Sequence, residues 1–189
     1  GYFGFANTSP DIYNSDLYVN NNSTERIIFA NVSTGNQYNG NIIVTQIGSS
    51  LGIAFGWSTS GSSAMAATKK ISVGAAGFST GYLQLIRFTQ NGSAPISLNL
   101  AGNTTAYLGP NSSFGGNFTL SADNIWAQGA TYNGTATFTK TGGTNNHNQG
   151  YQNIFNSTCE IIQQSSGGYF MLGYNSNDLF NDNIIVNST

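Results

Sequence analysis

The hydrophobic pattern of this chain repeats a short motif. An aromatic residue is followed by a small residue two positions on, and by apolar residues four and six positions on. Alternation with period two is typical of a β-strand that turns one face to a core, and a small second residue lets the chain bend or lie close to a neighbour. The motif recurs as Tyr13-Ser15-Leu17-Val19, Tyr38-Gly40-Ile42-Val44, Phe114-Gly116-Phe118-Leu120, Tyr132-Gly134-Ala136-Phe138, Phe155-Ser157-Cys159-Ile161 and Phe180-Asp182-Ile184-Val186.

A second, shorter apolar segment precedes the aromatic residue that leads the motif. Asn- and Gly-rich turns separate the segments, and both residue types accept the backbone conformations that tight turns require. We expect no helix beyond a short helical turn at Ser62–Thr68. The short segments are Tyr2–Phe5, Arg26–Phe29, Gly52–Phe55, Thr105–Leu108 and Tyr169–Leu172.

The motifs recur with a period of about 24 residues. The interval between Tyr38 and Phe114 is about three periods long, with weaker alternation inside it. On a larger scale, residues 168–189 align without a gap on residues 1–22, 167 residues earlier. We therefore predict one continuous β-repeat array over residues 1–189. It contains one superrepeat of about seven units (1–167) and the start of the next (168–189).

Units of this length with two or three short strands predict an all-β fold, a β-solenoid (parallel β-helix) with coils of about 24 residues. Each coil would pair with the coils above and below at a rise of roughly 4.8 Å. A β-sandwich is the alternative, because it also has short strands at regular spacing. The first and last units are neither atypical nor more polar than the others. We therefore expect further coils, or another copy of the chain, to stack on them.

Composition narrows the function classes. Charged residues make up only 6% of the chain and the net charge is −2, which offers no footprint for nucleic acid or anionic membranes. No apolar run is long enough to span a bilayer, and the single cysteine cannot form an intrachain disulfide. Abundant Asn and Thr with scarce Lys and Glu suit an extracellular β-protein.

Several segments resemble long repetitive surface proteins of Bacteroidetes. Those proteins carry tandem F-N-G-x-x-x-V and L-G-P-N-S-x-F-x-G units and look like secreted adhesins or fibres. The resemblance implies export, tandem continuation and a structural or adhesive role, and it supplies no catalytic residues. The segments that carry it are Tyr38–Val44, Gly77–Gly81, Leu108–Asn117 and Gly129–Ala136.

Candidate catalytic and metal-binding residues are sparse. His147 has no carboxylate or second His nearby in sequence, so we expect an exposed loop residue. Cys159 occupies an inward position of its motif and is expected to be a buried structural residue. Asp178 and Asp182 with neighbouring Asn oxygens could hold a surface Ca²⁺. Because the pair Asp11 and Asp16 occupies the same repeat element, however, repetition favours a structural role. We expect no cofactor and no enzymatic activity.

Surface residues suggest two further features. The outward aromatics Tyr18, Tyr82 and Trp126 could stack on sugar rings, and three threonines of Thr135–Thr139 would share one face, as in ice-binding proteins. Asn-x-Ser/Thr acceptor patterns are frequent. The candidate glycosylation sites are Asn7, Asn22, Asn31, Asn91, Asn103, Asn111, Asn133, Asn156 and Asn187.

These observations lead to one expected function and one alternative. We expect a structural or adhesive repeat segment of an extracellular surface fibre, partnered by copies of itself, end to end or in covalent tandem, and by surface glycans. The alternative is a carbohydrate-binding module of a secreted protein.

Overall fold

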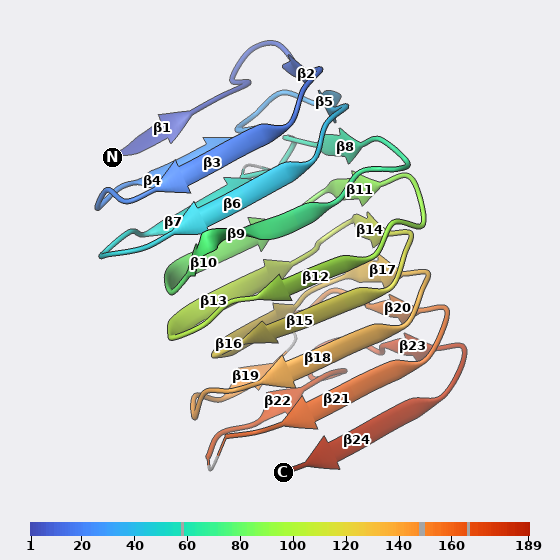
Figure 1. The fold of residues 1–189 in the computed structure, drawn as a ribbon. Coiled ribbons are helices and arrows are strands. Elements are labelled where there is room, and N and C mark those ends of the chain that lie inside the picture. Colours follow the sequence, from blue (N-terminus) through green and yellow to red (C-terminus); the bar gives the residue numbers. More distant parts are fainter. Residues whose placement is uncertain (58, 148–149, 166) are drawn as a thin grey trace.

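A computed structural model describes residues 1–57, 59–147, 150–165 and 167–189. The described residues form 24 strands and no helix. Every strand pair is parallel, and the two strands of each pair lie three positions apart in the chain. The chain therefore winds through eight coils of three strands, with its two ends at opposite ends of the stack (Figure 1). This is the predicted β-solenoid and not the β-sandwich.

Three sheets run along the solenoid. Sheet A contains β1 (Tyr2–Gly4), β4 (Arg26–Phe29), β7 (Gly52–Phe55), β10 (Thr80–Leu85), β13 (Asn103–Leu108) and β16 (Asn124–Ala127), and the pair β19 (Asn146–His147) and β22 (Phe170–Met171) follows it in the last two coils. Sheet B contains β2 (Ile12–Tyr13), β5 (Asn36–Tyr38), β8 (Ser63–Met65), β11 (Phe88–Gln90), β14 (Ser112–Phe114), β17 (Ala130–Tyr132), β20 (Ile154–Phe155) and β23 (Leu179–Phe180). Sheet C contains β3 (Leu17–Asn21), β6 (Ile42–Gln46), β9 (Ile71–Phe78), β12 (Ile96–Asn99), β15 (Phe118–Ala122), β18 (Ala136–Lys140), β21 (Cys159–Gln163) and β24 (Ile184–Ser188).

The repeat motif turns a corner of the solenoid. The motif predicts one strand, but its leading aromatic ends a strand of sheet B and its apolar pair lies on the next strand of sheet C. The small second residue occupies the corner between them. At Gly40, a Cβ atom would lie 2.3 Å from the carbonyl carbon and oxygen of Ser15 in the preceding coil. At Gly40 the corner therefore leaves no room for a side chain, because two coils come into backbone contact there.

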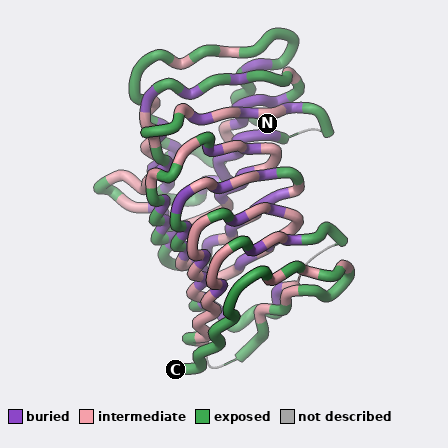
Figure 2. The backbone as a smooth tube through the Cα atoms, turned by 90° about the vertical axis from the view of Figure 1, so that its right-hand side faces the viewer, coloured by how far each residue is buried: buried purple, intermediate pink, exposed green. Residues whose placement is uncertain are grey.

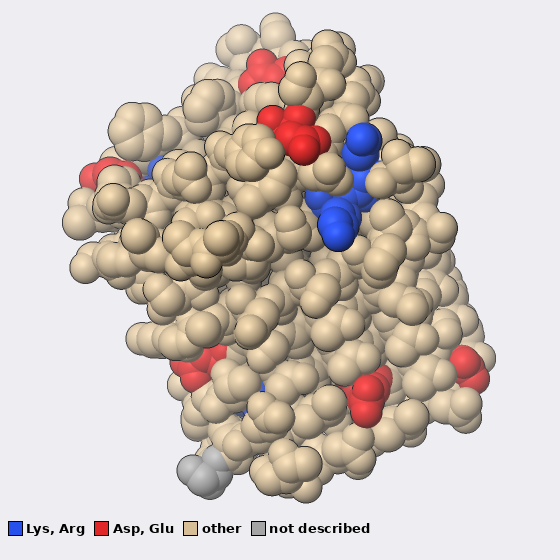
Figure 3. Space-filling view, in the orientation of Figure 1, with Lys and Arg blue, Asp and Glu red and all other residues tan. Residues whose placement is uncertain are grey.

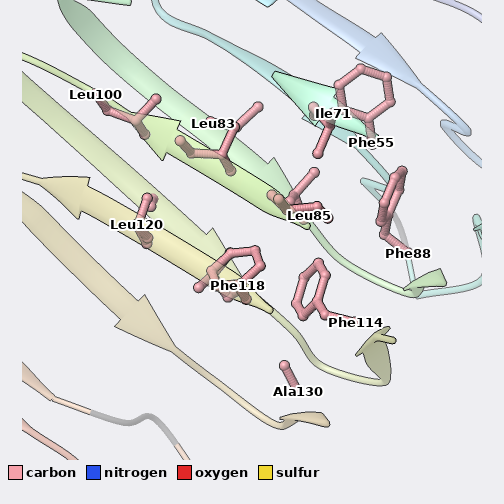
Figure 4. Close-up of a cluster of buried hydrophobic side chains, with 14 of the residues drawn as sticks. Phe55, Ile71, Leu83, Leu85, Phe88, Leu100, Phe114, Phe118, Leu120 and Ala130 are labelled. Carbon is pink, nitrogen blue, oxygen red and sulfur yellow. The ribbon is translucent and has the colours of Figure 1, made fainter. Parts of the chain in front are cut away.

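Ladders of aromatic rings fill the interior. At the start of the solenoid, Phe29 stacks on Phe5 and on Phe55 at centroid distances of 4.9 and 5.0 Å. At the other end, Phe155 stacks on Tyr132 at 5.0 Å and on Phe180 at 4.9 Å. These distances match the coil rise expected for paired strands. Apolar side chains from all three sheets point into this core (Figure 4), and exposure increases at the first and last coils (Figure 2).

The central coils depart from the motif. Met65 and Gln90 take the place of the aromatic leaders, because Met65 pairs with Tyr38 in register and Gln90 pairs with Met65. Phe88 supplies the missing ring and packs 6.0 Å from Phe55. The predicted helical turn at Ser62–Thr68 is wrong, since strand β8 occupies residues 63–65 and no helix follows it before Thr68. Adjacent coils on both sides offer backbone partners in register, and this pairing overrides the weak local helix preference of the alanines.

Asparagine amides link successive coils along the outside of sheet B. The Asn39 amide nitrogen donates a hydrogen bond of 2.9 Å to Asn14 Oδ1 in the preceding coil. In the last three coils, Asn156 donates to Asn133 and Asn181 donates to Asn156, both at 2.8 Å. These exposed rows hold neighbouring coils in register where the apolar core does not reach.

Candidate functional site

A row of rings follows the outer face of sheet A along the solenoid. Alternation along the strands creates it, because Leu83, Ala106 and Ile125 point inward and their neighbours point outward. The centroids of consecutive rings are separated by 4.4 Å (His147 and Tyr174) to 6.3 Å (Trp57 and Tyr82). The row consists of Trp57, Tyr82, Tyr107, Trp126, His147 and Tyr174.

The first rings of the row lie over a position without a side chain. At Gly52, a Cβ would meet three carbons of the Tyr82 ring at 2.6 Å, so this ring covers the backbone of β7. Trp57 stacks on Tyr82, and the guanidinium carbon of Arg26 lies 4.8 Å from the Trp57 ring centroid. The cation–π contact orients Trp57 at the start of the row.

A pocket of about 520 Å³ opens beside this row. The turn Gly48–Leu51 forms one side, and outward residues of β10 and β13 form the other. Tyr82 and Tyr107 contribute two rings at an interplanar angle of 77°, and Asn103 and Thr105 contribute polar groups. The volume falls within the range of small-molecule sites, roughly 300–1,000 Å³.

The electrostatics of the pocket are neutral. None of the described residues that line it carries a charge. Burial raises the pKa of Tyr82 and of Tyr107 above the ordinary tyrosine value, because a phenolate would lose hydration. Both hydroxyls therefore stay protonated around neutral pH. Elsewhere on the molecule charged side chains are also few and scattered, as Figure 3 shows for one face.

The outward aromatics predicted from the sequence separate in space. Tyr82 and Trp126 belong to the row, whereas Tyr18 is 67% exposed on the outer face of sheet C. Sequence reasoning missed Tyr107, although the alternation in Thr105-Ala106-Tyr107-Leu108 places it outward. It placed Asn103 only among the candidate glycosylation sites, and the place of this residue in the pocket could not be predicted because it depends on which coils become neighbours.

The expectation for His147 is wrong. It lies on strand β19 and is half-buried, with the Trp126 ring at 5.4 Å on one side and the Tyr174 ring at 4.4 Å on the other. The side chain of the preceding residue, Asn146, explains why this segment lies alongside sheet A as a strand. Its Oδ1 accepts a hydrogen bond of 3.0 Å from the Ile125 backbone nitrogen, which fastens β19 to β16.

The repeated acidic residues act as acceptors between coils. Asp178 Oδ1 accepts a bond of 2.8 Å from the Asn153 backbone nitrogen, and Asp182 Oδ2 accepts one of 3.2 Å from the Thr158 hydroxyl. Asp16 likewise accepts a bond of 2.8 Å from the Asn41 backbone nitrogen. Across the described ranges, no three His, Cys, Asp or Glu residues gather in one place.

Cys159 lies at the inward position predicted for it. It is fully buried on β21 between Ala136 and Ile184, its in-register neighbours. Burial raises the pKa of its thiol from about 9 to about 12, which keeps it protonated and unreactive.

Most candidate glycosylation sites lie on the surface. Asn31 is buried, and its amide donates to Asn7 Oδ1 at 3.1 Å. Asn133 and Asn156 belong to the outer asparagine row. Those whose residues are exposed are Asn7, Asn22, Asn91, Asn103, Asn111, Asn133, Asn156 and Asn187.

The threonines of β18 do not continue as a long array. Thr137 pairs in register with Thr119 on one side and with Glu160 on the other. Thr139 pairs with Ser121 and Ile162. The flat row of threonine methyl and hydroxyl groups therefore extends over two coils only.

Comparisons with protein families, with curated proteins and with solved structures found no match for this chain. The described residues include no helix with the length and hydropathy that crossing a membrane would need.

Proposed function

We propose that this chain is a structural segment of an extracellular fibre, in which the β-solenoid continues by stacking on another copy of itself or on further repeats of the same chain. The supporting observation is that the last coil resembles the first in its sequence pattern and in its place in the repeat. Residues 168–189 repeat residues 1–22, and the two stretches occupy equivalent places in coils 8 and 1.

The equivalent positions differ in what covers them. Val19 in the first coil is 3% exposed, because the second coil covers it with Val44 in register. Its counterpart Val186 faces the same way in the last coil and is 68% exposed. The outer surface of coil 8 thus repeats a surface that is buried inside the molecule, so a coil of the same kind, such as the first coil of a second copy, would fit against it.

The internal ladders of stacked rings reach both ends of the solenoid. Phe5 and Tyr13 are the outermost rings at one end, and Phe180 is the outermost ring at the other. The backbone edges of β3 and β24, which are the two edge strands of sheet C, remain available for strand pairing, and such edges favour association with another chain. Stacking would bury the rings and pair the edges together.

The extracellular assignment rests on composition. Scarce charge, many asparagines and one buried thiol suit a secreted β-protein that needs no disulfide.

The experiment compares two neighbouring substitutions in β24. Val186→Lys places a charge where the next coil would stack, and Ile185→Lys places the same charge on the outward face of the same strand. Both residues are exposed already, so neither change should cost much folding stability. We expect the parent chain and Ile185→Lys to form elongated multimers with rising concentration, measured by light scattering and electron microscopy, and Val186→Lys to remain monomeric. A parent chain that stays monomeric at millimolar concentration, or a Val186→Lys variant that assembles like the parent, would refute end stacking.

A further inference from the structure

The pocket on sheet A has the geometry of a ligand site. Its two tyrosine rings meet nearly at right angles, so a planar ligand ring can lie against one and touch the other with its edge. Gly81 allows β10 to pass close under the turn, since a Cβ there would meet the Ser50 and Leu51 carbonyl oxygens at 2.4 Å. The turn and the strand therefore pack closely against each other, and the pocket is present without a bound ligand.

The lining selects a class of ligand. A phosphate or carboxylate would find no cation among the described lining residues, and a purely apolar molecule would leave the Asn103 amide and the Thr80 and Thr105 hydroxyls without partners. A pyranose ring meets both requirements, because one face carries C–H groups and the rim carries hydroxyls. Amide and hydroxyl groups can both donate to and accept from those hydroxyls.

We propose that this pocket binds a neutral saccharide, with one sugar ring against Tyr82 and Tyr107 and adjoining sugars laid along the aromatic row. The row supports an extended ligand because Trp57 lies on one side of the pocket and Trp126 on the other, each 6.3 Å from the nearer tyrosine. This site goes beyond the stacking role and does not depend on it, because the pocket lies on the side of the solenoid and not at an end.

The test uses the Val186→Lys chain, so that binding is measured whether or not the ends associate. A glycan array carrying neutral and acidic oligosaccharides is probed first, and the best neutral hit is then titrated by calorimetry. We expect saturable binding of neutral oligosaccharides and weaker binding of uronate chains. Tyr107→Ala should weaken binding at least about tenfold, because it removes one ring wall.

Two further variants make the titration decisive. Tyr18→Ala removes an exposed tyrosine from sheet C, away from the pocket, and should leave the affinity unchanged. Asn103→Ala removes a polar group from an exposed position at the pocket, where folding is not at stake, and should also weaken binding. An array with no neutral hit, a preference for uronates, or equal affinity in Tyr107→Ala, Asn103→Ala and Tyr18→Ala would overturn the site.

Discussion

The aromatic ladder predicts that the same substitution costs more in the middle of a ring stack than at its end. Phe155 is 1% exposed and stacks on Tyr132 and Phe180, whereas Phe180 is half-buried and, among the described rings, stacks on Phe155 alone. Replacing a fully buried Phe by Ala costs about 3–5 kcal/mol, so we expect about 4 kcal/mol for Phe155→Ala. With about half the burial and one stacking partner, Phe180→Ala should cost about 2 kcal/mol.

Urea unfolding followed by far-UV circular dichroism measures this difference. With a slope of about 2 kcal/mol per M urea, the midpoint should fall by about 2 M for Phe155→Ala and by about 1 M for Phe180→Ala. The measurement is made at low protein concentration, where stacking on another copy cannot bury Phe180. Equal midpoint shifts for the two variants, with unchanged slopes, would show that ring contacts between coils do not set the stability.

Two other predictions concern the corner and the buried thiol. Gly40→Ala should destabilise the chain by about 2 kcal/mol or more, because its Cβ would overlap the Ser15 backbone. Gly143→Ala is the matched control, since a Cβ atom there would lie 3.9 Å from the nearest atom of another residue. Thermal melting compares the stability of the two variants. The raised pKa of Cys159 predicts that stability is complete below about pH 9 and declines as the pH rises toward 12, because the unfolded thiol ionises first. The urea midpoint should fall between pH 8 and pH 11, and this fall should be smaller in Cys159→Ala than in the parent. An identical fall in both chains would exclude the thiol as a contributor to the pH dependence of stability.

The period and the inward columns could be predicted from the sequence because they depend on local alternation. Val44 and Leu120 lie inside because their strands alternate, whatever the neighbouring coil contains. The corner could not be predicted in the same way. The reason for Gly40 lies in the backbone of Ser15, which becomes its neighbour only after a full turn of the solenoid.

The candidate site shows the same division. Alternation is enough to place Tyr82 and Trp126 outward, but the pocket needs the turn at Gly48–Leu51 to lie beside β13, two coils further along the chain. The central coils add a second limit. In the fourth coil the motif would place its aromatic ring at Gln90, but Phe88, two residues earlier on the same strand, fills that part of the interior. Local alternation alone does not determine which residue supplies the ring.

The outer asparagine rows give the solenoid a polarity. Each amide nitrogen in these rows donates to the asparagine of the coil before it. At the first coil the row therefore ends with the Asn14 amide nitrogen, a donor, and at the last coil it ends with Asn181 Oδ1, an acceptor. The parallel strands have the same sense throughout. A contact between unlike ends is heterologous and leaves one new end of each kind exposed. Association through these ends would therefore produce open polymers of graded length, with all subunits pointing the same way, and never a closed dimer.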